Sequence, residues 1–124
     1  MENFVNFKLA QKLKEKGFIL GKNEIYGKFD SDGLFHPQLY FNYIETMDCD
    51  EIIAPTISQV LKWLREKKGW IIVVRLYSTN GWYWFIQDKN GELKSSHLAS
   101  CDDCFATYEQ AALAGIEYAL NYLL

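Results

Sequence analysis

The sequence contains only two prolines, three cysteines and two histidines in 124 residues. An odd number of cysteines is not typical of a disulfide framework and indicates reduced thiols. The first residues, MENFVNFKLAQKLKEKG, lack the apolar centre of a signal peptide. No apolar run reaches the length of about 20 residues that a membrane span requires. We therefore expect a cytoplasmic protein with no membrane segment.

An excess of positive charge is also missing. The chain has 13 Lys and Arg against 16 Asp and Glu, which gives a net charge of -3. Most nucleic-acid-binding domains are basic, so this balance makes nucleic acid an unlikely partner. Hydrophobic residues make up 49% of the chain and charged residues 23%, which is typical of a folded protein. The length predicts a single domain over residues 1–124.

The sequence lacks the motifs of the common catalytic sites. It has no Gly-x-Ser-x-Gly, His-Glu-x-x-His, phosphate-binding or dinucleotide-binding fingerprint. Of the two histidines, His36 precedes a proline in a strand-like run, and His97 closes another such run. Neither has a nucleophile and an orienting group at a recognisable spacing. We expect no enzymatic activity and no cofactor.

Three helices are predicted by N-cap residues that precede apolar residues at helical spacing. The first helix begins after Asn6 and ends at Gly17, and the second ends at Gly69. Thr56 and Gln59 have the spacing of a capping box at the start of the second helix. The third helix begins after Thr107. Its small residues recur along one stripe, which predicts a close approach to a sheet: Ala111, Gly115 and Ala119.

Five strands are predicted by β-branched and aromatic runs, at residues 24–29, 34–43, 70–77, 82–87 and 92–97. The first two flank a segment at residues 30–33 whose Asp-x-Asp-Gly pattern is typical of a turn and lacks the further ligands of a calcium loop. The third strand has Arg75 as its only charge, so we expect it at the centre of a sheet. The order α-β-β-α-β-β-β-α predicts an α+β fold, with helices packed on one face of an antiparallel sheet.

One set of residues has the composition of a zinc site. Cys101 and Cys104 form a Cys-x-x-Cys pair, and His97 and Cys49 would complete a Cys3His set. Structural zinc sites more often have two such pairs, and no glycine shapes this one. A redox role is disfavoured because the helix begins several residues after the pair. We therefore interpret the pair as part of a loop, with zinc as the weaker alternative.

Three stretches together form a recognisable pattern: FVNFKLAQKLKEKGF, APTISQVLKWLREKKG and FATYEQAALAGIEYALNYL. This pattern resembles a group of small uncharacterised proteins encoded in Bacteroides-type genomes and in their phages and prophages. The resemblance covers around half of the chain and implies no activity. Small proteins of mobile elements often bind a host protein, so the resemblance implies a role in protein binding.

Two hypotheses follow for function. The first is a non-enzymatic protein-protein interaction module, which binds another protein or a second copy of itself. Its expected contact residues are aromatic: Tyr83, Phe85, Tyr118 and Tyr122. The second is a nucleic-acid-associated protein that uses the aromatic strands together with a local basic patch: Lys62, Arg65, Lys67 and Lys68.

Overall fold

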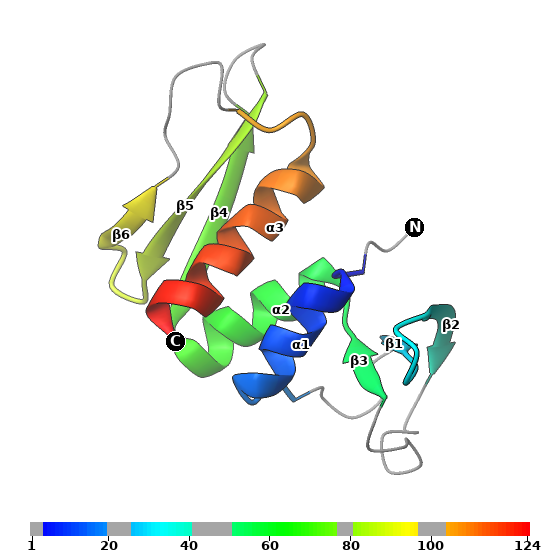
Figure 1. Ribbon diagram of the computed structural model, residues 1–124. Helices are drawn as coiled ribbons and strands as arrows, with labels where there is room; N and C mark the ends of the chain where they lie inside the picture. Colours follow the sequence, from blue (N-terminus) through cyan, green and yellow to red (C-terminus); the bar gives the residue numbers. More distant parts are fainter. Residues whose placement is uncertain (1–3, 20–25, 41–50, 77–80, 97–103) are drawn as a thin grey trace. The chain divides into compact units, whose positions relative to one another are not determined.

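The computed structural model describes residues 4–19, 26–40, 51–76, 81–96 and 104–124. Helices and two three-stranded antiparallel sheets alternate along the chain (Figure 1). This confirms the predicted α+β class, and the order of elements matches except for one additional strand. The expected single sheet is replaced by two. The chain forms two compact units, residues 1–59 and 60–124.

The first unit contains helix α1 (Phe7–Glu15) and strands β1 (Tyr26–Phe29), β2 (Phe35–Tyr40) and β3 (Ile52–Ala54). The strands pair in the order β2-β1-β3. Strand β3 is the additional one. It has only three residues, too few for a recognisable alternation, and its pairing with β1 depends on contacts distant in sequence.

The start of α1 is as predicted. The Asn6 side chain accepts a hydrogen bond from the Leu9 amide at 2.9 Å, which satisfies one of the donors that a helix N-terminus leaves unpaired. The apolar face of the helix is buried through Leu9, Ala10 and Leu13. Gly17 follows the helix with a φ of 84°, a left-handed conformation that glycine adopts without steric cost.

The second helix begins with the predicted capping box. The Thr56 amide donates to Gln59 Oε1 at 2.9 Å, and the Gln59 amide donates to Thr56 Oγ1 at 3.1 Å. Helix α2 (Ile57–Trp63) continues as one wider, π-helical segment, η2 (Leu64–Lys68). It ends at Gly69, again in the left-handed conformation, which confirms the predicted stop.

The second unit contains strands β4 (Trp70–Leu76), β5 (Trp82–Asp88) and β6 (Leu93–Ser96), followed by helix α3 (Tyr108–Tyr118) and its π-helical extension η4 (Ala119–Leu123). The strand order is β4-β5-β6. The prediction that the strand beginning at Trp70 is central was therefore wrong. Apolar residues on both faces of a strand indicate what lies above and below the sheet, but not which edge of the strand is hydrogen-bonded.

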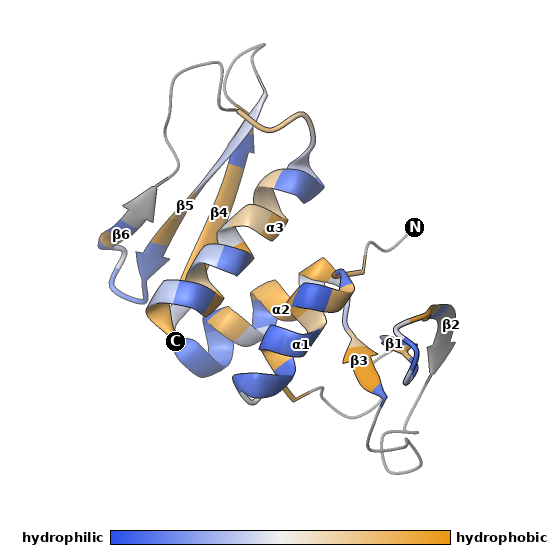
Figure 2. Cartoon of the chain, in the orientation of Figure 1, coloured by the Kyte–Doolittle hydropathy of each residue, from blue (hydrophilic) through white to orange (hydrophobic). Residues whose placement is uncertain are grey.

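Helix α3 lies against β4 and β5 (Figure 1). Its predicted N-cap is confirmed, because Thr107 Oγ1 accepts from the Gln110 amide at 3.1 Å. The stripe of small residues, Ala111, Gly115 and Ala119, is buried. Figure 2 shows β4 as a largely hydrophobic ribbon. Within the part of the chain that the structure describes, no helix is both long and apolar enough to cross a membrane.

Candidate functional site

The two faces of the second sheet differ in what they contact. Residues directly opposite in an antiparallel pair have their side chains on the same face, and successive residues alternate between faces. Ile72 and Trp84 face α3, because a Cβ built on Gly115 would lie 3.0 Å from Ile72 Cγ2 and 3.3 Å from Trp84 Cγ. Val73 and its partner Phe85 must therefore project from the opposite face.

We call this opposite face the Phe85 face. On it, the Tyr83 and Phe85 rings lie 6.2 Å apart at an interplanar angle of 28°. The Arg75 guanidinium carbon lies 5.7 Å from the Phe85 ring centroid, within the range of a cation-π interaction. Arg75 is exposed, and the other members are half-buried. The β4 and β5 residues of the Phe85 face are Ile71, Val73, Arg75, Tyr83, Phe85 and Gln87.

The structure divides the four predicted contact residues into two pairs. Tyr83 and Phe85 meet on the Phe85 face, whereas Tyr118 packs on Trp84 at 5.3 Å between ring centroids. Tyr122 packs on Tyr118 with 4.8 Å between ring centroids and an interplanar angle of 40°, and its side chain is 72% exposed. Because Trp84 faces α3, the tyrosines of the C-terminal helix belong to a surface distinct from the Phe85 face.

Arg75 is a member of the Phe85 face that was not among the contact residues predicted from the sequence. The register of the hairpin places Arg75 opposite Tyr83 and Val73 opposite Phe85. The Asn-Gly dipeptide at residues 80–81 is typical of a two-residue turn, which would have placed Arg75 opposite Ile86 and not opposite Tyr83. Counting residues from that dipeptide would therefore have assigned Arg75 to the wrong face of the sheet.

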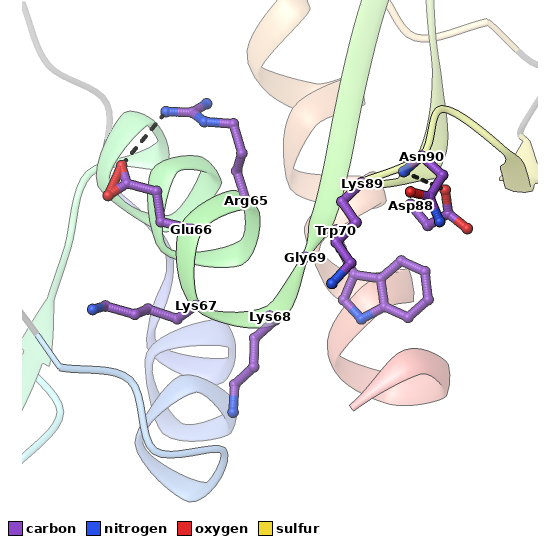
Figure 3. A pocket seen from close by; sticks show the side chains of 9 residues that line it. All are labelled: Arg65, Glu66, Lys67, Lys68, Gly69, Trp70, Asp88, Lys89 and Asn90. Atoms are coloured by element: carbon purple, nitrogen blue, oxygen red, sulfur yellow. Dashed lines mark hydrogen bonds and ion pairs between the residues drawn. The ribbon is translucent and has the colours of Figure 1, made fainter.

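The predicted basic patch is exposed on α2 and η2. Three of its members, Arg65, Lys67 and Lys68, line a pocket of about 440 Å³ together with Trp70 and Lys89. The three cations point in different directions from the helix (Figure 3). Two acidic residues also line the pocket, Glu66 and Asp88, and an Arg65 nitrogen lies 4.0 Å from Glu66. The fourth member, Lys62, does not line it. Divergent cations among carboxylates are a poor arrangement for holding a phosphate backbone.

The Asp-x-Asp-Gly segment forms a turn, as predicted. Asp30 Oδ1 accepts from the amides of Asp32 at 2.9 Å and Leu34 at 3.0 Å, and Asp30 Oδ2 lies 2.8 Å from His36 Nε2. The hydrogen bond from His36 is the largest of the effects that hold the pKa of Asp30 below its usual value of 3.8, followed by that from the Leu34 amide. The Asp30 carboxylate therefore stabilises the hairpin through hydrogen bonds to residues of the same hairpin.

Asp88 repeats this arrangement in the hairpin between β5 and β6. Its Oδ1 accepts from the amides of Asn90 at 2.9 Å and Glu92 at 3.0 Å. The hydrogen bond from the Glu92 amide is the main cause of a lowered pKa of Asp88. Both turns place a glycine with positive φ three residues after the aspartate, Gly33 at 80° and Gly91 at 83°. This is the geometry of a turn closed by a left-handed residue.

The zinc alternative lies mostly outside the described residues, since Cys49, His97 and Cys101 are not among them. Cys104 is a half-buried free thiol. Among the described residues, no group of three or more His, Cys, Asp or Glu side chains is arranged to hold a metal ion. The interpretation of the pair as a loop, with zinc as the weaker alternative, therefore stays untested.

Comparisons with protein-family models, with curated proteins and with solved structures found no match for this chain.

Proposed function

We propose that the protein is a non-enzymatic interaction module that binds a partner protein through the Phe85 face. The observation that carries this proposal is the composition of that face: aliphatic Ile71 and Val73, aromatic Tyr83 and Phe85, and Arg75 as the one charged side chain among its β4 and β5 members. Aromatic residues and arginine are enriched at protein-protein interfaces, and other charged residues are depleted from the centres of such interfaces.

The pairing of Arg75 with Phe85 adds to this argument. An arginine stacked on an aromatic ring is held in place and loses less side-chain entropy when a partner binds. Its guanidinium offers several donors to a carboxylate of the partner. We therefore expect a partner surface with an apolar centre and an acidic residue near its margin.

Charge favours a protein over a nucleic acid as the partner. Residues 60–124 carry seven basic and seven acidic side chains, so the unit that bears the Phe85 face is neutral overall. The four cations of the basic patch lie on α2 and η2 and not on this face. Stacking of bases on Tyr83 and Phe85 without a basic surface would leave the phosphates without counter-charge. The resemblance to proteins of phages and mobile elements supports a host protein in the cytoplasm as the partner.

The test is a pull-down from a host-cell lysate with the full tagged chain, divided into nuclease-treated and untreated halves. Three variants are compared with the wild type: Arg75→Glu, Phe85→Ser, and Tyr122→Ser as the control on the other surface. Circular dichroism verifies that each variant is folded. Arg75 is exposed, so its variant retains the fold even if Phe85→Ser does not.

We expect one protein to be retained in both halves by the wild type and by Tyr122→Ser, and to be lost with Arg75→Glu. Retention that disappears on nuclease treatment would replace this proposal with the nucleic-acid one. Equal retention by folded Arg75→Glu and Phe85→Ser would show that the Phe85 face is not the binding surface.

A further inference from the structure

Strand β4 presents a hydrogen-bonding edge. The Trp82 amide donates to Phe105 O, and the Phe105 amide donates to Trp82 O, both at 2.8 Å. The backbone groups of Trp82 therefore point away from β4, and its pairing with Leu76 is a non-hydrogen-bonded one. Hydrogen-bonded and non-hydrogen-bonded pairs alternate along an antiparallel ladder. The amides and carbonyls of β4 that point away from β5 therefore belong to Trp70, Ile72, Val74 and Leu76.

Of the four edges in the two described sheets, β4 is the one without a protective feature. Natural proteins protect edges with prolines, bulges, short strands or charges. Strand β2 contains Pro37 and a register irregularity, and β3 has three residues. Strand β6 has four residues, a register shift against β5 and a lysine, Lys94.

Strand β4, in contrast, pairs with β5 over seven consecutive residues without a register shift. It contains no proline, and Arg75 is its only charged residue. The side chain of Leu76 at its end is 57% exposed. A long, regular and apolar edge of this kind is a template for the addition of another strand.

We propose that β4 pairs with β4 of a second copy of this chain, antiparallel and centred on Val73. In this register, Ile72 lies opposite Val74, and Trp70 lies opposite Leu76. These are the residues whose backbone groups point away from β5, so each such pair would form two hydrogen bonds. The Trp70 indole would cover the exposed Leu76 side chain.

Charge also fits a second copy. Arg75 lies opposite Ile71 in this register, so no two like charges meet across the interface. A register shifted toward either end would leave part of the seven-residue strand unpaired. The resulting sheet has six strands and a two-fold axis, which is the commonest symmetry of homodimers.

This inference goes beyond the proposed function and does not rest on it, because it uses the edge of the sheet and not its face. The two are nevertheless compatible. Directly opposite residues share a face, so both α3 helices would lie on one side of the six-stranded sheet. The two Phe85 faces would then form one continuous surface on the other side.

The test measures the mass of the full chain in solution by sedimentation equilibrium over a range of concentrations. Val73 is its own partner in the proposed register, so Val73→Lys and Val73→Glu each place two like charges opposite each other. Val73→Thr is the matched control, since it keeps a β-branched side chain without charge. Val74→Pro removes an amide that points away from β5 and leaves the pairing with β5 intact.

We expect the wild type and Val73→Thr to sediment at twice the 14.5 kDa of the chain. The two charged variants should dimerise roughly tenfold more weakly, and a mixture of Val73→Lys with Val73→Glu should recover the dimer. Val74→Pro should be monomeric. A monomeric wild type would overturn the proposal. A dimer that the charged variants and Val74→Pro leave unchanged would also overturn it, because association would then use another surface.

Discussion

Gly115 of α3 lies directly over the indole of Trp84. A Cβ at position 115 would approach Trp84 Cγ to 3.3 Å and Ile72 Cγ2 to 3.0 Å, closer than most side-chain contacts in proteins. The absence of a side chain thus sets the distance between the helix and the sheet. The helix propensity lost by having glycine in the middle of a helix, about 1 kcal/mol relative to alanine, is the cost of this close packing.

Gly115→Leu should therefore destabilise the protein by about 1–3 kcal/mol through overpacking. Chemical denaturation measures this as a lower midpoint with an unchanged slope. Ala114→Leu, at the adjacent half-buried position, is the matched control and should change stability little. Equal effects of the two substitutions would contradict the close packing seen at Gly115.

Asp30 and Asp88, one in each of two hairpin turns, predict how the stability of the protein depends on pH. The pKa of Asp30 is lowered in the folded state, so the ionised carboxylate stabilises the fold at pH values above its unfolded pKa. This contribution is lost as the pH falls through the folded-state pKa. We expect the difference in melting temperature between the wild type and Asp30→Asn to be largest near pH 7 and to shrink toward pH 3.

Asp88→Asn should behave in the same direction, because the pKa of Asp88 is also lowered. Asp32→Asn is the control for the loss of a negative charge in the same turn. A difference that stays constant from pH 7 to pH 3 for Asp30→Asn would show that its carboxylate is not ionised and hydrogen-bonded as described.

Gly81 lies close to the backbone of Phe105, which precedes α3 and forms an isolated β-bridge with Trp82. Its φ is 125°, and a Cβ there would lie 2.6 Å from Phe105 O, the carbonyl that accepts from Trp82. Gly81→Ala should therefore cost more than the roughly 1–3 kcal/mol typical of backbone strain alone. Gly33→Ala is the matched control, because Gly33 also has positive φ but a Cβ added there would meet nothing within 4 Å. Thermal unfolding of the two variants should show a clearly lower midpoint for Gly81→Ala.

The capping box of α2 predicts coupling between two side chains. Thr56→Ala should destabilise the protein by about 1 kcal/mol. Gln59→Ala should cost less, because the higher helix propensity of alanine offsets part of the loss of the bond to the Thr56 amide. Since each residue bonds the backbone of the other, the double variant measures whether the two act together. Strictly additive losses in free energy of unfolding would contradict a cooperative capping box.

The helices were predictable because their boundaries are set locally. Asn6, Thr56 and Thr107 act as caps through bonds to residues within one turn, and such spacing is visible in the sequence. Strand β3 was not predictable in this way. Its partner is β1, more than twenty residues away, and Ile52 and Ile53 alone do not distinguish a strand from the approach to a helix.

The part of the Phe85 face that follows from local sequence was predicted, and the part that depends on contacts distant in sequence was not. Tyr83 and Phe85 alternate with Trp84 along one strand, so their common face follows from the period of two. Arg75 joins them only through the register of the hairpin. The separation of Tyr118 from this face depends on which side of the sheet α3 covers, and the amphipathic pattern of a helix does not specify that.

The register shift between β5 and β6, at Ile86 and Gln87, limits how far strands can be added. A sheet joined through β4 would end on both sides in a short, irregular β6 bearing Lys94, and such an end is a poor template for a further chain. Association would therefore close after two copies instead of growing into a filament. The short, irregular β6 would thus limit the assembly to a dimer.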